Sequence, residues 1–311
     1  MYNKLIMFRN LRILIIGCGT MANIHMRVLK NYVDSKNIFC HDSNELVLDQ
    51  FVNFNNVNKF KNEKGFDGII ISTPTNTHLE VYEMYKSISN FFFIEKPLVN
   101  NYSELIALGD SDYAKIYCGF IETHNKIFSE LLNTIQNQKI VSIQITRHSP
   151  KIENERISSN VDLDLAIHDL SVLLKYFLDI DKVNNLNNIK NFKPNNFYET
   201  SEIHLTDGNI IASISTSRIT NKKIRFWRVV TDLNTYEIDL LKNTITQFAP
   251  AGEYKFINSV FSQNLSRNEK LISIPEPADV QMKQFLNSII NKKIDNEDIK
   301  IIKKAHLLLL N

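Results

Sequence analysis

Up to about residue 119, short apolar runs alternate with stretches in which apolar residues recur at helical spacing. Unbroken apolar runs rich in Ile and Phe are typical of strands buried on both faces of a parallel sheet. Strands and helices that alternate along the chain favour a doubly wound α/β domain. The expected strands lie at 11–16, 37–41, 67–72, 91–97 and 115–118.

After residue 119 the pattern changes, because strand-like runs follow one another with few helical stretches between them. This order predicts an α+β domain with a mainly antiparallel open sheet. We therefore expect a Rossmann domain over residues 1–119 and a second domain over residues 120–311, whose C-terminal helices can pack back on the first. The expected elements are strands at 139–146, 201–205, 210–217, 224–231, 235–241 and 244–248, helices at 162–178, 286–290 and 299–310, and Asn-rich loops at 184–196 and 256–268.

Composition narrows the class of partner. The net charge is +2 and hydrophobic residues make up 43% of the chain, so neither nucleic acid nor a membrane surface is an expected partner. No apolar run approaches the roughly 20 residues of a membrane span, and no signal-peptide core forms, which predicts a cytoplasmic protein. Cys18, Cys40 and Cys118 lack metal-ligand spacing, so we expect no metal site and no disulfide framework.

A glycine-containing turn directly follows the first predicted strand. Gly17 permits a tight turn, Gly19 lets the backbone approach a pyrophosphate, and the small Ala22 allows the next helix to pack closely. Phosphate would bind at the N-terminus of that helix, where Thr20 and Met21 lie. The position of the turn between a strand and a helix predicts a dinucleotide site.

Two further strand ends indicate the same cofactor. Asp42 lies 23 residues after Gly19, near the spacing of about 20 at which a carboxylate binds the ribose hydroxyls of NAD. Because Asp42 would repel a 2′-phosphate, we expect NAD rather than NADP, although this residue can also cap the following helix. The residues expected to meet the nicotinamide half follow the strand at 67–72; they are Thr73, Pro74, Asn76 and His78.

The strand at 91–97 ends on Glu95, Lys96 and Pro97. In an open α/β sheet the ligand crevice lies outside the carboxyl ends of the strands, so Glu95 and Lys96 would emerge into it. Pro97 keeps Lys96 extended and prevents a helix from starting there. A lysine held at a cleft by a rigid element can take or give a proton, whereas an isolated strand-end lysine usually only reaches into water.

The second half of the chain offers a candidate general base. Asp164 and His168 are four residues apart at the start of a predicted helix, so they share one face while apolar residues cover the rest. A His beside a carboxylate is the usual arrangement of a general base whose ring is oriented by its partner. A lone His on an apolar helix is more often a core residue, but the dinucleotide turn and Lys96 favour a catalytic role here.

Together these motifs resemble those of the Gfo/Idh/MocA oxidoreductase family, in the family's order and over nearly the whole chain. The resemblance is carried by Gly17-x-Gly19-x-Met21 with His25, Thr73-Pro74 with His78, Glu95-Lys96-Pro97, and Asp164-x-x-x-His168. Within the family the chain looks most like UDP-N-acetylglucosamine 3-dehydrogenases, through residues 119–122, 164–169 and 217–225. Residues 123–126 depart from that subgroup, which leaves the sugar open.

The resemblance implies NAD-dependent oxidation of a secondary hydroxyl, at C3 of a nucleotide sugar such as UDP-N-acetylglucosamine. Lys96, Asp164 and His168 would be catalytic and would contact the substrate, and Glu95 and Lys96 would also line the cofactor site. Whether Lys96 or His168 is the base stays open. Arg156 and Arg225 could neutralise a diphosphate, although each could equally be an ordinary surface charge.

The resemblance also implies a Lys96–Pro97 bond that can be cis, and a homo-oligomer, a dimer or tetramer, built on the exposed face of the second sheet. Two alternatives keep the fold. The substrate could be a free sugar or an inositol-like polyol, or the chain could be an NAD-binding regulator without chemistry. A regulator needs no Lys, Asp and His in register, which favours the enzyme.

Overall fold

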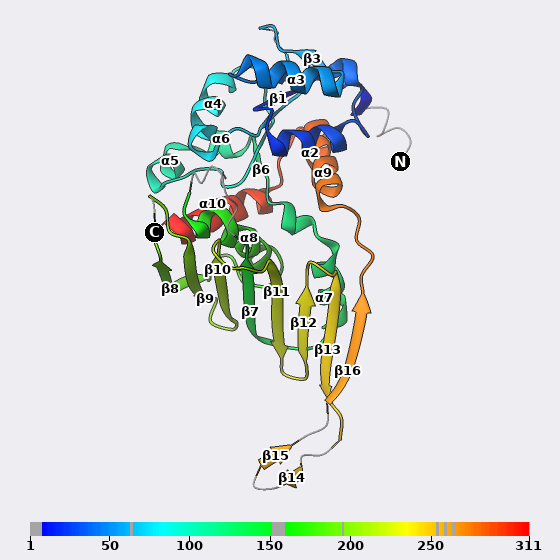
Figure 1. Ribbon diagram of the computed structural model, residues 1–311, viewed down its shortest axis with the longest axis vertical. Helices are drawn as coiled ribbons and strands as arrows, with labels where there is room; N and C mark the ends of the chain where they lie inside the picture. Colours follow the sequence, from blue (N-terminus) through cyan, green and yellow to red (C-terminus); the bar gives the residue numbers. More distant parts are fainter. Residues whose placement is uncertain are drawn as a thin grey trace. The chain divides into compact units, whose positions relative to one another are not determined.

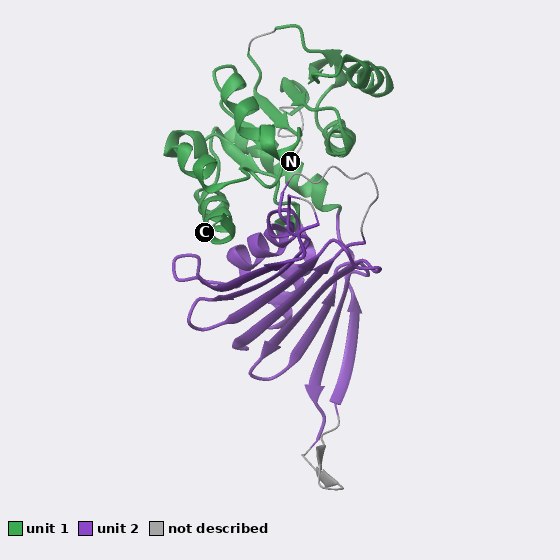
Figure 2. Cartoon of the chain, turned by 60° about the vertical axis from the view of Figure 1, so that its left-hand side comes forward, with its two compact units in different colours: residues 1–124, 276–311 green, residues 125–275 purple. Residues whose placement is uncertain are grey.

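The computed structural model describes residues 8–62, 65–150, 159–194, 196–252, 255–257, 260–262 and 265–310. The chain divides into two compact units, one formed by residues 1–124 with 276–311 and one by residues 125–275 (Figure 2). The sequence pattern predicts one domain over residues 120–311. The structure instead groups residues 276–311 with residues 1–124.

The first unit is built on a six-stranded sheet in the order β3-β2-β1-β4-β5-β6, and all of its pairs are parallel. This is the strand order of dinucleotide-binding folds, and it reverses between β1 and β4. The predicted Rossmann domain is confirmed. Its strands are β1 (Ile13–Ile16), β2 (Ile38–His41), β3 (Asn58–Lys59), β4 (Gly68–Ile71), β5 (Phe92–Ile94) and β6 (Ile116–Cys118). Among these strands, Figure 1 labels β1, β3 and β6.

Helices connect these strands and extend the unit at the C-terminal end of the chain. The α-helices are α2 (Thr20–Leu29), α3 (Glu45–Asn55), α4 (His78–Tyr85), α5 (Tyr102–Ala107), α6 (Asp110–Tyr113), α9 (Pro277–Asn291) and α10 (Asn296–Leu310). Short 3₁₀ turns are η1 (Ser35–Asn37), η2 (Thr75–Thr77) and η3 (Ile121–His124). Because β1, β4, β5 and β6 are buried at every residue, their unbroken apolar runs were readable from the sequence.

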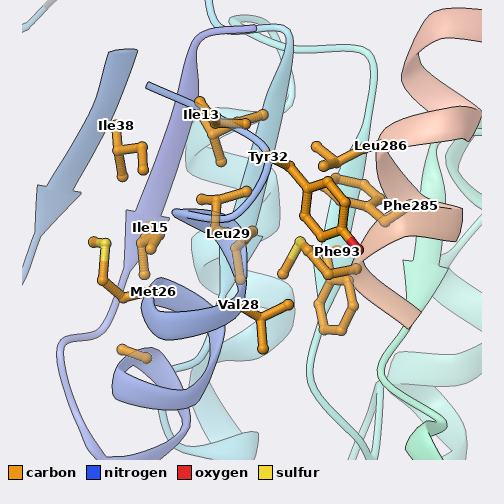
Figure 3. Close-up of a cluster of buried hydrophobic side chains, with 14 of the residues drawn as sticks. Ile13, Ile15, Met26, Val28, Leu29, Tyr32, Ile38, Phe93, Phe285 and Leu286 are labelled. Atoms are coloured by element: carbon orange, nitrogen blue, oxygen red, sulfur yellow. The ribbon is translucent and has the colours of Figure 1, made fainter. Parts of the chain in front are cut away.

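The core of this unit explains why α9 belongs to it. The Phe285 ring of α9 meets the Phe93 ring of β5 edge-on, with 5.6 Å between ring centroids (Figure 3). The Tyr32 hydroxyl donates to Asp279 Oδ2 at 2.7 Å, which links α9 to the segment after α2. The helix predicted at 286–290 is therefore only the end of a longer helix, whose start at Pro277 follows the preference of proline for the first turn.

The second unit contains an eight-stranded sheet in the order β16-β13-β12-β11-β7-β10-β9-β8. Its pairs are antiparallel except β7 with β10, which confirms the predicted mainly antiparallel sheet. The strands are β7 (Ile140–His148), β8 (Asn184–Asn191), β9 (Thr200–Thr206), β10 (Ile211–Ser217), β11 (Ile224–Thr231), β12 (Thr235–Asp239), β13 (Thr244–Pro250) and β16 (Leu265–Leu271); β14 (Lys255–Ile257) and β15 (Val260–Ser262) form a separate pair.

The two Asn-rich segments predicted as loops, 184–196 and 256–268, are corrected in part by this sheet, which takes in residues 184–191 as β8 and residues from 265 onward as β16. β8 pairs with β9 and β16 pairs with β13, so both are edge strands. Edge strands are held by backbone hydrogen bonds to one neighbour and keep much of their side-chain surface in water. Their polar composition therefore gives little sign of a strand.

Helices of the second unit cover one face of its sheet. The ring of Phe128 in α7 (Lys126–Thr134) lies 4.8 Å from the buried Trp227 ring of β11. Phe177, directly after α8 (Ile167–Tyr176), lies 5.8 Å from the same ring. The helix predicted at 162–178 begins with a π-helical turn, η4 (Asp162–Ala166), before it continues as α8.

Within the described ranges, no helix combines the length and the apolar character that crossing a membrane requires. The three cysteines are buried and free. Among the same residues, no group of three His, Cys, Asp or Glu side chains is arranged to hold a metal ion.

Candidate active site

The turn after β1 is fixed by its neighbours at the carboxyl edge of the sheet. Gly17 has φ +87°, and a Cβ there would lie 2.8 Å from the Thr73 backbone nitrogen. Its N–H donates to the His41 carbonyl at 2.9 Å, and Ser72 Oγ donates to the Gly17 carbonyl at 2.8 Å. Both the left-handed conformation and the close approach of the next strand end therefore require glycine at this position.

Gly19 differs from Gly17 in what surrounds it. Its φ of −84° suits any residue, and nothing lies within 4 Å of where a Cβ would stand. Gly19 is also the N-cap of α2, so the N-cap has no side chain that could bind the N–H groups of the first turn. The first turn itself carries no acidic residue. Open space beside a helix N-terminus of this kind fits a bound phosphate, so the turn fits a dinucleotide.

Asp42 lies after β2 and braces the same turn. Its Oδ2 accepts the Cys18 N–H at 2.7 Å and its Oδ1 accepts the Asn44 N–H at 2.8 Å. The carboxylate thus holds the glycine turn directly. The capping role left open by the sequence falls to Asn44, whose side chain accepts the Leu46 N–H in the first turn of α3.

The predicted nicotinamide-side residues separate into two groups. Thr73, Pro74 and Asn76 keep exposed surface at the end of β4, as a ligand contact requires. His78 is only 1% exposed, and its ring nitrogens lie 2.9 Å from the Pro97 and Thr73 carbonyl oxygens. His78 thus lies buried between the backbones of two loops, and its contact with the nicotinamide half stays a prediction.

Glu95 at the end of β5 is buried. His25 Nε2 donates to Glu95 Oε1 at 2.7 Å, because a carboxylate can only accept from it. Burial by itself would raise the pKa of Glu95, but the hydrogen bond and charge of His25, together with Lys96, hold that pKa below its ordinary value. A Cβ on Gly119 would lie 3.0 Å from Glu95 Oε2, so this glycine makes room for the carboxylate.

Lys96 is the half-buried residue that follows this carboxylate. Its backbone N–H donates to Glu95 Oε2 at 3.2 Å, and the Lys96–Pro97 peptide bond is cis, as the family resemblance implies. The buried Glu95 therefore shapes the backbone under Lys96, and its place in the cofactor site stays a prediction. The lysine extends from a strand end that two neighbouring strands, β4 and β6, hold in place.

In the second unit, Asp164 and His168 stand out on an otherwise buried segment. Of residues 161–170, all of which are described, only these two are not buried. Arg218 Nη1 donates to Asp164 Oδ2 at 3.2 Å, and its Nε donates to the buried Glu199 at 2.9 Å. Arg218 thus ties Asp164 to the strands β9 and β10.

The π-helical turn beneath Asp164 has its own support. The Ile167 N–H bonds the Asp162 carbonyl, which is the wide i to i+5 spacing of a π-turn. The fully buried Asp162 side chain accepts from Lys190 Nζ at 2.6 Å and from Asn188 Nδ2 at 3.2 Å, both on β8. The edge strand that sequence analysis missed therefore supports the turn that carries Asp164. Single π-turns of this kind occur frequently at functional sites.

Asp169 anchors α8, next to His168. Its carboxylate forms a buried ion pair with Arg147 of β7, in which Arg147 Nη2 donates to Oδ1 at 2.9 Å. Trp227 Nε1 donates to the same oxygen at 3.0 Å. Two central strands therefore fix the helix on which His168 stands.

Of the two arginines predicted to bind a diphosphate, only Arg225 lies within the described residues. Arg225 Nη1 donates to the His148 carbonyl at 2.9 Å and its Nη2 donates to Ser149 Oγ at 3.1 Å, so its guanidinium braces the end of β7. Arg156 lies outside the described residues.

Several buried polar residues near the candidates were not predicted from the sequence. Arg218 lies directly after β10, inside a segment quoted only for the family resemblance. His306 is a single polar residue on the apolar face of α10, the pattern that usually indicates a core residue. The residues concerned are Asp162, Asp169, Arg147, Glu199, Arg218 and His306.

Comparisons with known proteins give sequence similarity over about half of the chain. No family model matches. The chain is 24% identical over 178 residues to the myo-inositol 2-dehydrogenase of Thermotoga maritima, a match that covers 52% of this chain and 53% of that protein. It is 18% identical over 172 residues to an inositol 2-dehydrogenase of Rhizobium meliloti, covering 51% of this chain and 52% of that protein.

Solved structures are similar over almost the full length. They include a UDP-N-acetylglucosamine 3-dehydrogenase from Acidithiobacillus ferrooxidans (TM-score 0.74, 19% identity, 96% of this chain and 95% of that chain). A 3-ketoreductase from Actinomadura kijaniata, in complex with TDP-benzene and NADP, has a TM-score of 0.80 at 9% identity, with 96% of each chain covered. A Gfo/Idh/MocA family oxidoreductase from Vibrio cholerae has a TM-score of 0.72 at 16% identity, again over 96% of each chain. The predicted resemblance is confirmed: this chain has the fold of the Gfo/Idh/MocA oxidoreductases.

Proposed function

We propose that this chain is a nicotinamide-dependent oxidoreductase that acts on a secondary hydroxyl of a sugar. The observation that carries the proposal is the carboxyl edge of the first sheet. There a glycine turn with room for phosphate follows β1, and the half-buried Lys96 and a cis-proline loop follow β5, two strands that flank β4 in one sheet. This edge is where doubly wound folds bind their ligands.

The turn at Gly17 and Gly19 would hold the pyrophosphate, and Thr73, Pro74 and Asn76 would line the nicotinamide side. We favour NAD over NADP because the carboxylate of Asp42 would repel a 2′-phosphate. When bound, the nicotinamide supplies the acceptor for the hydride that leaves the sugar carbon. Comparison of the Kd values for NAD and NADP tests the preference, and tighter NADP binding would overturn it.

The protein's own residues would manage the proton. Oxidation of a hydroxyl to a ketone releases one proton as the C–H bond gives up its hydride, so a base must accept that proton. The amine of Lys96 and the imidazole of His168 are the two candidates, and a protonated Lys96 would stabilise negative charge on the oxygen. That both act on the same hydroxyl, with Asp164 orienting His168, stays a prediction from the sequence.

We infer that the substrate is a nucleotide sugar oxidised at C3, such as UDP-N-acetylglucosamine. The motif resemblance and the fold shared with an enzyme of that name support this choice. The second candidate is an inositol-like polyol, which the sequence similarity to a myo-inositol 2-dehydrogenase favours. A homo-oligomer built on the open sheet face and a cytoplasmic location stay predictions.

The test is an incubation of the purified protein with UDP-N-acetylglucosamine and NAD, with and without 2-oxoglutarate as a hydride sink, followed by mass spectrometry. A product two hydrogens lighter is expected. Parallel reactions with myo-inositol and with NADP distinguish the alternatives. NAD binding without turnover of any sugar would contradict the enzyme and favour the regulator.

A further inference from the structure

One buried peptide group next to Lys96 is held at both of its polar atoms by histidines. The carbonyl of the Pro97–Leu98 peptide lies 2.9 Å from His78 Nδ1, and its N–H donates to His306 Nε2 at 2.9 Å. Pro97 and Leu98 are buried. A buried peptide group needs such partners, because leaving it unpaired costs about as much as a lost hydrogen bond.

The contacts of His306 allow only one protonation state. Its Nδ1 lies 2.8 Å from the Ile302 carbonyl, which can only accept, so Nδ1 carries the proton. Nε2 must then offer a lone pair to the Leu98 N–H. The ring is fully buried and stacks on Phe120, with 6.0 Å between centroids, so it has little freedom to turn. A neutral imidazole with its proton on Nδ1 satisfies both bonds, and no other form does.

We propose that His306 is a positioning residue for Lys96, an inference that rests on the function proposed above. The backbone at Lys96 is held on one side, where its N–H meets Glu95 Oε2 at 3.2 Å. On the other side the N–H of the next peptide group donates to His306 of α10, and its carbonyl lies against His78 at the start of α4. Loss of the His306 bond would release the Leu98 N–H and shift the Lys96 amine relative to a bound substrate.

Two substitutions separate the hydrogen bond from packing. His306→Gln can place its side-chain oxygen where Nε2 lies and accept the Leu98 N–H, whereas the shorter amide of His306→Asn reaches only the Nδ1 position. We expect His306→Asn to lower kcat by about 10- to 100-fold with little change in the Kd for NAD, because misplacement by about 1 Å can have an effect of this size. His306→Gln should stay within about threefold of wild type. Lys304→Ala on the same helix is the control. Equal kcat in the Asn and Gln variants would overturn the proposal.

A second readout does not depend on turnover. Hydrogen exchange at the Leu98 amide should speed up by at least about tenfold in His306→Asn and stay near wild type in His306→Gln. In the wild-type protein, ¹⁵N shifts of His306 should report a proton on Nδ1, and the opposite tautomer would overturn the proposal even if neither variant folds. A wild-type protein that protects Leu98 but oxidises no sugar would instead contradict the proposed function.

Discussion

The two candidate catalytic segments are built by different means. Lys96 follows β5, an interior strand of a parallel sheet, and this strand is held by backbone ladders to β4 and β6. Asp164 and His168 stand on a π-turn and helix that depend on side chains from distant strands, including Arg218 and Lys190. A site built on backbone pairing leaves a local signature in the sequence, and a site built on long-range ion pairs does not.

The largest effect should come from removing the Lys96 amine. Lys96→Ala should lower kcat by about 10²- to 10⁴-fold while NAD binding stays nearly intact, because the role proposed for the amine is at the reacting oxygen and not at the pyrophosphate. Steady-state kinetics and NAD titration measure the two quantities. Lys86→Ala, which alters an exposed lysine paired with Glu83, is the matched control. An unchanged kcat would remove Lys96 from the mechanism.

The largest loss of folding stability is expected in the second unit. Arg147→Met leaves Asp169 buried and without its ion-pair partner, which should lower the free energy of unfolding by about 3–5 kcal/mol. Urea unfolding measures the loss. Arg228→Met, which breaks an exposed pair with Glu237, should cost under about 1 kcal/mol. Similar losses in both variants would show that the buried pair is not the anchor of α8.

The glycine turn allows a sharper comparison within one unit. Gly17→Ala should lower the free energy of unfolding by about 2–4 kcal/mol, because its positive φ and the nearby Thr73 backbone both oppose a Cβ. Gly19→Ala should change stability by under about 0.5 kcal/mol and still weaken NAD binding about tenfold. Thermal unfolding and NAD titration of the pair separate the two effects. Unaltered NAD binding in Gly19→Ala would argue against a phosphate at this turn.

A smaller loss of folding stability is expected as the pH falls. Burial lowers the pKa of His306 from 6.5 to about 4, and the nearby His78 also opposes its charge. Because the folded pKa is the lower one, the stabilisation is complete above the unfolded pKa and is lost as the pH falls towards 4. Between about pH 7 and pH 4.5 this amounts to about 2 kcal/mol. Denaturant unfolding of wild type and His306→Gln measures it, since the variant should lack this part of the acid sensitivity. If the free energy of unfolding fell equally with pH in both proteins, this would contradict the assignment of the acid sensitivity to His306.

The sequence predicted the first unit well and the second only in outline. The strands at 13–16, 38–41, 68–71 and 92–94 were found because buried parallel strands are continuously apolar. The strands β8 and β16 were missed because an edge strand needs only a neighbour's backbone and tolerates Asn and Lys. The helix at 162–178 was predicted, but its π-turn was not, since no residue type marks that turn.

The sequence by itself determined the order in which the motifs of the parallel strands follow one another along the chain. It also determined the glycine turn and the lysine at a strand end. These features depend on local backbone conformation and on the periodic pattern of buried residues, and both are encoded within each segment. Only the tertiary structure decided that α9 and α10 join the first unit, that His78 and His306 hold one peptide group, and that Arg218 holds Asp164. These features depend on contacts between residues far apart in the chain, and no local sequence pattern identifies both partners of such a contact.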